Sequence, residues 1–363
     1  MDNNLSRIKI KGFKSIKVLD LKMKPINVLI GANGSGKSNF ISIFRLFENI
    51  HNKRLQKYLI NGGGADGFLH FGSKVTEKIS VYVKIKKNEY HATLSKNDEQ
   101  DTLTITDNAG FYSQLSDVNY NPSISYDSFE SGIADSDKSI VKYSRKYLKE
   151  CKLYHFHDTS STAKFKTWRD INSNQSLASF AENLAPFLYR LKQDFNDDYQ
   201  NILSAVQTVA PYFQDFDFSI NGENILLRWQ HKNDLSNLGF SAQALSDGTA
   251  RFICMATLFL QPKDMRPATI VLDEPEIGLH PAALTVLSDM IKAVSNDEGQ
   301  VIISTQSVEL ANHFEVDDFI VVNYENGESK FERLSEKDLG SWMKSYQVGE
   351  AWSEGLLGGE PEW

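Results

Sequence analysis

Three short runs of consecutive apolar residues are typical of strands buried on both faces. Residues 26–30 read INVLI, residues 269–272 read TIVL and residues 300–305 read QVIIST. Strands covered on both sides lack the alternation of half-exposed strands and occur mainly in parallel sheets. One helix-length segment separates the second run from the third, so a right-handed crossover should make these two strands parallel and near neighbours. The pattern predicts an α/β core.

In other parts of the chain, apolar and polar residues alternate, as in strands, or apolar residues recur at helical spacing. Apolar and polar positions alternate in residues 78–87 (KISVYVKIKK) and 91–96 (HATLSK), which predicts an antiparallel sheet. Residues 39–50, NFISIFRLFENI, repeat at helical spacing. Residues 177–210 predict one or two amphipathic helices interrupted by Pro186, and no heptad repeat persists for four heptads. A long coiled coil is therefore not expected.

The run at residues 26–30 leads directly into a glycine-rich loop, GANGSGKS, and then into a helix. This is the context that a P-loop requires, because the glycines let backbone N–H groups surround phosphate oxygens at a helix N-terminus. A glycine turn that only caps a helix would not explain Lys37, which would reach the β and γ phosphates, or Ser38, which would bind Mg²⁺. We predict an ATP site formed by Gly31, Ala32, Asn33, Gly34, Ser35, Gly36, Lys37, Ser38 and Asn39.

Two acids follow the run at residues 269–272, at the end of a strand where open α/β sheets bind ligands. Asp273 suits the indirect Mg²⁺ role of a Walker B aspartate, and Glu274 suits a general base that polarises the attacking water. A strand-end turn with two solvated acids is the alternative. After the third run, Gln306 either responds to the γ-phosphate or is an ordinary strand-end amide.

Residues 244–252, ALSDGTARF, allow two interpretations. A serine, an aspartate and a glycine in a row are typical of a helix start. The free N–H groups of a helix N-terminus also bind phosphate, so the segment could be half of an active site whose other half belongs to a second molecule.

Charge is distributed unevenly along a chain whose net charge is -8. The first 100 residues hold 18 Lys and Arg against 8 Asp and Glu, or +10, and the rest hold 21 against 39, or -18. This asymmetry suggests a side that faces DNA or another polyanion, or simply a solvated basic face. We expect a cytoplasmic protein with no membrane partner, because no apolar window could span a bilayer. Cys151 and Cys254 have no metal-ligand spacing and should be buried, reduced thiols.

With GANGSGKS, ALSDGTARF, VLDEPEIGLHP and VIISTQS in this order, the chain resembles ABC-type ATPases of the SMC/RecF/OLD superfamily. It is most similar to the stand-alone bacterial ATPases of that group, whose typical segment YHFHDTSSTAK it shares. The resemblance implies a Mg²⁺-dependent ATP hydrolase that dimerises head to tail, or forms a higher oligomer, with each ATP between one Walker A loop and the other subunit's signature. It assigns residues 31–38 to Walker A, Ser246, Asp247, Gly248 and Thr249 to the signature, Asp273 and Glu274 to Walker B, and residues 276–280 to the D-loop.

The chain departs from that pattern in three places. Asp247 replaces a second signature glycine, and Gln306 stands where transporter-type members carry a histidine, so it cannot titrate. No Q-loop glutamine is obvious, and His157 or Asp158 is the positional candidate near Mg²⁺. Alternate spacing of His155 and His157 also allows a zinc site, although no second histidine pair accompanies it. By the same resemblance, Lys14 would lie near the adenine or the phosphates.

The predicted fold is an α/β P-loop NTPase, one ABC-type head over residues 1–363 with a mixed or antiparallel lobe I sheet, a parallel core sheet and a helical lobe II. Lobe I covers residues 1–165, with Walker A and an irregular polar insertion at about 96–140. A helical and strand insert covers residues 166–240. Lobe II covers residues 241–363, with the signature, Walker B and the switch.

The predicted function is ATP hydrolysis coupled to a DNA-related process. OLD-family proteins append a Toprim nuclease, but only 57 residues follow Gln306, so we expect a separate effector protein such as a nuclease in DNA repair or anti-phage defence. An ATP-gated clamp or scaffold with slow or no turnover is the first alternative. The motor subunit of a transporter is the second, and no coupling surface for membrane helices is evident.

Overall fold

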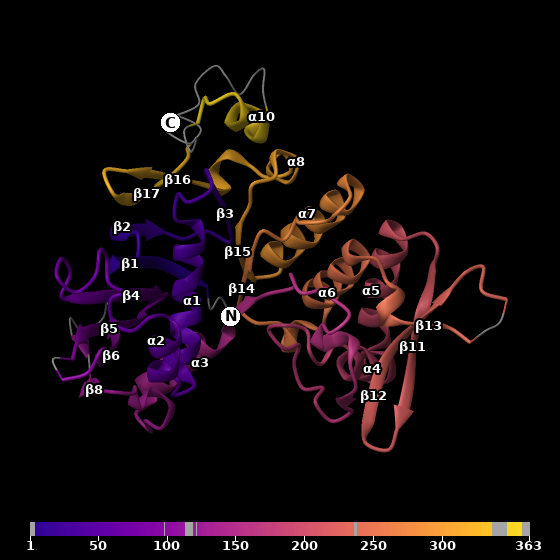
Figure 1. The fold of residues 1–363 in the computed structure, drawn as a ribbon, viewed down its shortest axis with the longest axis horizontal. Coiled ribbons are helices and arrows are strands. Elements are labelled where there is room, and N and C mark those ends of the chain that lie inside the picture. The colour runs from indigo at the N-terminus through magenta and orange to yellow at the C-terminus, as the bar shows by residue number, and fades with distance from the viewer. Residues whose placement is uncertain are drawn as a thin grey trace. The chain divides into compact units, whose positions relative to one another are not determined.

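The computed structural model describes residues 4–97, 99–112, 119–120, 122–235, 238–335 and 347–357 (Figure 1). The chain forms two compact units, which are described separately. Unit 1 consists of Met1–Leu153, Ala268–Val271 and Asp297–Trp363, and unit 2 of Tyr154–Pro267 and Leu272–Asn296. These units differ from the predicted lobes, because the C-terminal strands pair with the P-loop strand and therefore belong to the N-terminal unit.

The first sheet of unit 1 is antiparallel, with the order β2-β1-β4-β5-β6-β7 and with β8 paired to β6. Its alternating strands confirm the prediction for residues 78–96. The expectation of an irregular insertion at residues 96–140 is wrong, because much of this polar segment extends the sheet as β6 and β8 and then begins a helix. The strands are β1 (Leu5–Phe13), β2 (Ile16–Lys22), β4 (Lys78–Ile85), β5 (Asn88–Lys96), β6 (Leu103–Tyr112), β7 (Asn119–Tyr120) and β8 (Ser123–Ser128).

The second sheet of unit 1 contains the predicted buried strands, in the order β17-β16-β3-β15-β14-β9. Strand β3 is parallel to both of its neighbours, and every residue of β3 and β15 is buried. Strands β14 and β15 are neighbours, as the crossover argument requires. The strands are β3 (Ile26–Ile30), β9 (Cys151–Tyr154), β14 (Thr269–Asp273), β15 (Gln300–Ser304), β16 (Phe319–Glu325) and β17 (Glu328–Arg333).

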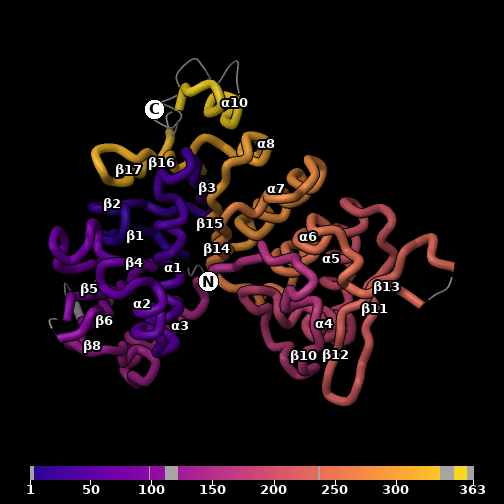
Figure 2. Tube along the Cα trace, viewed as in Figure 1, coloured from indigo at the N-terminus to yellow at the C-terminus, as the bar shows by residue number. Residues whose placement is uncertain are grey.

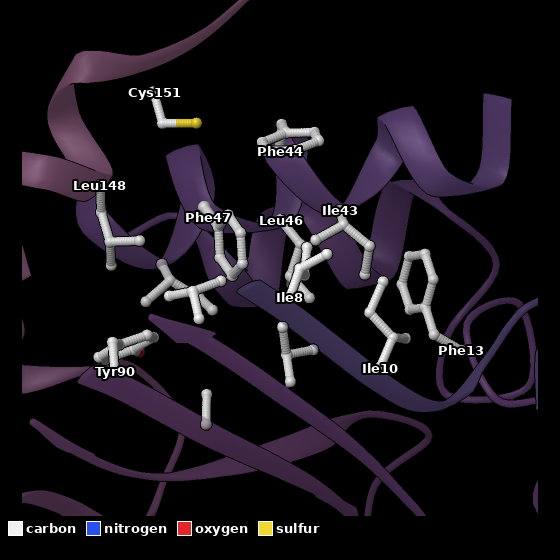
Figure 3. Close-up of a cluster of buried hydrophobic side chains, with 14 of the residues drawn as sticks. Ile8, Ile10, Phe13, Ile43, Phe44, Leu46, Phe47, Tyr90, Leu148 and Cys151 are labelled. Carbon is white, nitrogen blue, oxygen red and sulfur yellow. The ribbon is translucent and has the colours of Figure 1, made fainter. Parts of the chain in front are cut away.

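Helix α1 (Lys37–His51) packs its apolar face on the antiparallel sheet (Figure 3). Phe44 and Phe47 lie above Ile8 of β1 in this core, and Cys151 lies at its edge. Cys151 and Cys254 are free and buried, as expected, and burial raises the pKa of both thiols to about 12. The other described helices of unit 1 are α2 (Leu55–Asn61), α3 (Ser139–Glu150), α8 (Val308–Ala311) and α10 (Val348–Ser353).

Unit 2 combines four helices with a small antiparallel sheet, which Figure 2 shows in magenta to orange. Pro186 does not interrupt a helix, because it lies in the first turn of α4, where a missing N–H costs nothing; the break falls at Phe195. Among the described residues no helix could cross a membrane. The elements are α4 (Leu184–Asp194), α5 (Asn196–Val209), α6 (Asp247–Leu260), α7 (Pro281–Asn296), β10 (Arg169–Asp170), β11 (Phe213–Asn221), β12 (Asn224–His231) and β13 (Phe240–Ser241).

Short 3₁₀ turns complete the described chain. The last of them, which contains Asp317 and Asp318, leads directly into β16. They are η1 (Gly132–Ala134), η2 (Lys164–Lys166), η3 (Ala242–Ala244), η4 (Lys263–Met265) and η5 (Val316–Asp318).

Candidate nucleotide site

The loop between β3 and α1 has the backbone of an anion cradle. Gly31, Gly34 and Gly36 have backbone φ angles of 151°, 81° and 112°, which residues other than glycine rarely adopt. A Cβ atom at Gly31 would lie 2.2 Å from the Val322 carbonyl oxygen, whereas one at Gly34 would meet nothing within 4 Å. The loop is therefore packed against β16 on one side and open on the other.

The N-terminus of α1 presents its positive end to the open side of this loop. Its N-cap is Gly36, and no side chain caps it. The buried Lys37 ammonium donates to the carbonyl oxygens of Gly31, at 2.6 Å, and Ala32, at 2.9 Å. A buried ammonium beside a helix N-terminus fits a phosphate chain, because both contribute positive charge. Asn33, Ser38 and Asn39 belong to the same loop and first helical turn.

Two serines far apart in the sequence hold the loop in place. Ser329 Oγ of β17 donates toward the Ser35 carbonyl, at 2.5 Å, and lies 2.7 Å from Ser15 Oγ. Ser15 Oγ also accepts a hydrogen bond of 2.7 Å from Asn39 Nδ2. A Cβ atom at Gly36 would lie 2.0 Å from Ser329 Oγ, so the contact is tight. We call Ser15, Asn39 and Ser329 the loop clamp.

Replacing Ser329 with alanine should loosen the loop clamp. The buried Ser35 carbonyl would lose its partner, which costs about 1 kcal/mol of folding free energy, and nucleotide affinity should fall by about 2-fold to 10-fold. Thermal unfolding and titration with a fluorescent ATP analogue measure the two effects. Ser6→Ala in β1 is the matched control, because its hydroxyl bonds only the Lys84 carbonyl at the surface. Unchanged affinity in Ser329→Ala would contradict the role of the clamp.

A pocket of about 540 Å³ adjoins the clamp in unit 1. Ser15 belongs to both, and the remaining wall includes the partly exposed aromatic rings of Phe71 and Tyr324. Lys14, which only the family resemblance placed near the nucleotide, also lines it, and its ammonium lies 5.5 Å from the Phe68 ring centroid. Burial, with Arg45 nearby, lowers the pKa of Lys14. Aromatic faces beside a phosphate cradle could accommodate a nucleobase.

Gln306 lies at the same sheet edge as the cradle. Ser304, the last residue of β15, is paired in register with Leu29 of the parallel strand β3, and the Thr305 N–H donates to the Leu29 carbonyl. Gln306 is exposed directly after this pair. Its amide therefore stands at the carboxyl edge from which the P-loop starts.

In unit 2, ALSDGTARF forms the start of α6, so the helix-cap interpretation is correct. Ser246 is the N-cap, and its Oγ accepts from the Thr249 N–H at 3.2 Å and donates to Thr249 Oγ1 at 2.8 Å. Tyr212 holds Thr249 through a hydroxyl contact of 3.0 Å. Asp247 is exposed in the first helical turn, where its charge is stabilised by the positive end of the helix. This accounts physically for an acid at that position.

Arg251, which the sequence did not single out, connects the signature to two neighbouring segments. Its guanidinium donates to the carbonyl oxygens of Phe156, at 3.3 Å, and His157, at 2.9 Å. It also donates to the Ile277 carbonyl in the predicted D-loop. Gly248 packs on the same loop, because its Cβ position is 2.4 Å from the Gly278 carbonyl oxygen. The signature, the D-loop and the His157 segment are therefore joined within unit 2.

Glu274 has a strained backbone, with a φ of 47°. Non-glycine residues adopt this region rarely, and such strain clusters at functional sites. Glu274, Asp273 and His157 line one cavity of about 10 Å³, which is enough for about one water molecule. Unit 2 thus brings the two acids predicted to form Walker B together with one of the two predicted Q-loop candidates.

The other residues near His157 have local roles. Asp158 accepts hydrogen bonds from the backbone and hydroxyl of Ser160, which lower the pKa of the Asp158 carboxyl. The His155 ring stacks on Phe180. Within the part of the chain that the structure describes, no group of three or more His, Cys, Asp and Glu side chains could hold a metal ion. The alternative of a zinc site therefore gains no support.

Comparisons with known proteins agree with this geometry. A family model described as "AAA domain, putative AbiEii toxin, Type IV TA system" matches residues 26–312. The chain is also similar to the Smc head bound to the C-terminal winged-helix domain of ScpA, with a TM-score of 0.56, 18% identity and coverage of 94% of this chain and 99% of that one. A head domain with an extended coiled coil from Pyrococcus furiosus, bound to the C-terminal domain of ScpA, gives a TM-score of 0.54 and 15% identity over 94% and 98% of the chains. No curated protein matches.

Proposed function

The chain belongs to this AAA-domain family, with the fold of an SMC-type ATPase head, and we propose that it hydrolyses ATP between two copies of itself. The observation that carries the proposal is the cradle formed by Gly31, Gly34 and Lys37. The open side of Gly34 and the uncapped α1 terminus fit a triphosphate. The pocket at Lys14, Phe71 and Tyr324 would receive the base.

Each predicted residue has a distinct task in this mechanism. Lys37 neutralises charge on the β and γ phosphates, and Ser38 with Asp273 would hold Mg²⁺, which when bound supplies further neutralisation of the phosphate oxygens. Glu274 accepts a proton from the attacking water and orients it. Gln306 positions that water or the γ-phosphate through its amide, without changing charge. His157, beside Glu274 in its cavity, is the Q-loop candidate that this geometry favours.

The signature would complete the site of the partner subunit. The Gly248 N–H lies in the first turn of α6 and can donate to a γ-phosphate. Ser246 Oγ and the Thr249 N–H, which bond each other in this structure, would exchange that bond for the phosphate. Asp247 is exposed in this turn, as is Ser246, and would face the partner's nucleotide edge. Arg251 then acts as a positioning residue, since it joins the signature to the D-loop and to His157.

Replacing Ser246 with arginine should stop turnover without weakening ATP binding by the monomer. The bulky cation would block the partner's γ-phosphate site, so we expect at least a 100-fold loss of ATPase rate and an unchanged ATP dissociation constant. Steady-state phosphate release and equilibrium ATP titration measure the two. Ser246→Ala, which removes the hydroxyl and the cap but adds no bulk, is the comparison. Equal loss of binding and turnover would refute the site shared between subunits.

We further propose that the protein is cytoplasmic and couples ATP turnover to DNA through a separate effector, such as a nuclease acting in repair or anti-phage defence. Two observations support this: SMC heads that share the fold bind a separate protein, ScpA, and the family description names a toxin of a toxin–antitoxin system. Purifying tagged Glu274→Gln protein from its host with ATP tests the proposal. A clean homodimer without nucleic acid or a second protein would count against it.

A second candidate is an ATP-gated clamp with slow turnover. Gln306 favours it, because an amide cannot exchange protons with the reacting water as a histidine can. The two candidates differ in whether the wild-type ATPase rate exceeds that of a variant lacking Glu274.

A further inference from the structure

One face of the antiparallel sheet in unit 1 is polar and carries an excess of cations. On β1, Ile8 and Ile10 point into the core, while Arg7, Lys9 and Lys11 alternate with them and point outward. The inward face packs on α1 and α3, and the outward side chains of the described strands β1, β2, β4 and β5 are half-buried or exposed. The outward side chains of β2, β1, β4 and β5 are called the outer sheet face.

Strand register defines the arrangement of this face. Arg7 is paired with Lys22 on one side and Lys84 on the other, and Lys9 with Asp20 and Tyr82. The face carries six cations against two acids. The cations are Arg7, Lys9, Lys11, Lys22, Lys78 and Lys84, and the acids are Asp20 and Glu89.

The two acids leave several cations available to a ligand. Asp20 pairs with Arg7 at 2.6 Å and with Lys9 at 3.6 Å, and Glu89 pairs with Lys84 at 3.8 Å. Within the described ranges, the other three lysines, Lys11, Lys22 and Lys78, make no ion pair. Ser80, Thr93 and Ser95 contribute hydroxyl groups to the face, and the imidazole of His91 lies among them, with its Nε2 3.0 Å from Ser80 Oγ.

This chemistry fits a phosphate backbone better than a protein surface. Protein interfaces need a buried apolar centre, and the large apolar side chain exposed on the outer sheet face is Val18 alone among the described residues. Phosphates are bound by Lys, Arg and hydroxyl groups. Outward residues of one strand are spaced by about 6.8 Å, which is about two nucleotides of helical rise.

The face also favours a duplex over a single strand. Single strands bind by stacking bases on exposed aromatic rings. Among the outward positions of the described strands, Tyr82 is the one Phe, Tyr or Trp side chain, and the Lys9 ammonium lies 5.5 Å from its ring centroid. We propose that the outer sheet face binds the phosphate backbone of duplex DNA. This proposal gives the DNA of the proposed function a location, yet it does not depend on ATP hydrolysis.

The test uses the full chain, a labelled 30-base-pair duplex and salt from about 50 to 200 mM. Each lysine on a phosphate contributes about 0.9 to the slope of log affinity against log salt. Replacing Lys11, Lys22 and Lys78 together with glutamate should raise the dissociation constant at least 10-fold and reduce the slope by about three. The charge-matched control replaces Lys142, Lys146 and Lys149, which lie on α3 beyond the covered side of the sheet.

The possible results of this experiment distinguish failure of the DNA-binding proposal from failure of the proposed ATPase function. Equal losses in both variants, an unchanged slope in the face variant, or a wild-type protein that does not bind the duplex would overturn it. Tighter binding of a single strand or of duplex RNA through the same lysines would also overturn the assignment to duplex DNA. ATPase activity without DNA should be unchanged in the face variant. Loss of DNA binding with normal ATPase, or DNA binding without ATPase, therefore identifies which of the two proposals fails.

Discussion

Glu274→Gln should reduce the ATPase rate by about 10²-fold to 10⁴-fold and leave ATP affinity unchanged, because an amide of the same shape cannot accept the proton of the attacking water. Single-turnover and steady-state phosphate release measure the rate, and equilibrium titration measures the affinity. ATP-dependent dimers should accumulate in this variant, since the step that would dissolve them is blocked.

The chain offers a matched control for that substitution. Glu298 is an exposed glutamate with a φ of 62°, close to the 47° of Glu274, so Glu298→Gln makes the same chemical change at a similarly strained backbone. It should retain the wild-type rate. A wild-type rate no higher than that of Glu274→Gln, with or without DNA, would instead establish the ATP-gated clamp.

Lys37→Ala should weaken ATP binding at least 100-fold. The substitution removes a buried positive charge whose ammonium lies within 3 Å of two loop carbonyls, at the place where phosphates enter. Bound ATP stabilises a protein by about 2.7 kcal/mol at 100 times the dissociation constant. The wild-type melting temperature should therefore rise by several degrees in ATP, and that of Lys37→Ala should not.

Two controls distinguish lost ATP binding in Lys37→Ala from a general loss of structure. Removing a lysine from a buried position should not unfold the protein, so circular dichroism of Lys37→Ala without nucleotide should match the wild type. Lys57→Ala, at an exposed position on α2, is the control and should keep the full ATP response. A normal ATP-induced shift in Lys37→Ala would show that nucleotide binds elsewhere.

Runs rich in β-branched residues and leucine made the core sheet predictable, because only a strand buried on both faces carries apolar side chains on both of its sides. The strands within residues 96–140 were not predicted, because their sequence lacks a clear hydrophobic pattern. Its strand β6 lies in a sheet with a polar outer face, and its inward positions include Asp107, which is buried and bound by Tyr90 and Ser131. A strand with polar residues on both sides shows no hydrophobic alternation.

Parts of the candidate site could not be predicted because they depend on contacts between distant residues. Ser15 and Ser329 are 314 residues apart, and each is an ordinary hydroxyl in the sequence. Arg251 reaches carbonyl oxygens 94 and 26 residues away, and backbone acceptors carry no sequence signal. The P-loop, by contrast, is local, so its residues and their spacing were sufficient.

The strand order of the second sheet affects how the protein is made. The P-loop strand β3 is synthesised early, but both of its neighbours, β15 and β16, and the clamp residue Ser329 come from residues 300–329. At about 5 to 20 residues per second, a ribosome needs about 15 to 60 s to extend the chain from Ser38 to Ser329. During that interval the nascent chain has the ATP-binding sequence without its supporting strands. Nucleotide can therefore stabilise this protein only near the end of its synthesis, when β15, β16 and Ser329 have joined the P-loop strand.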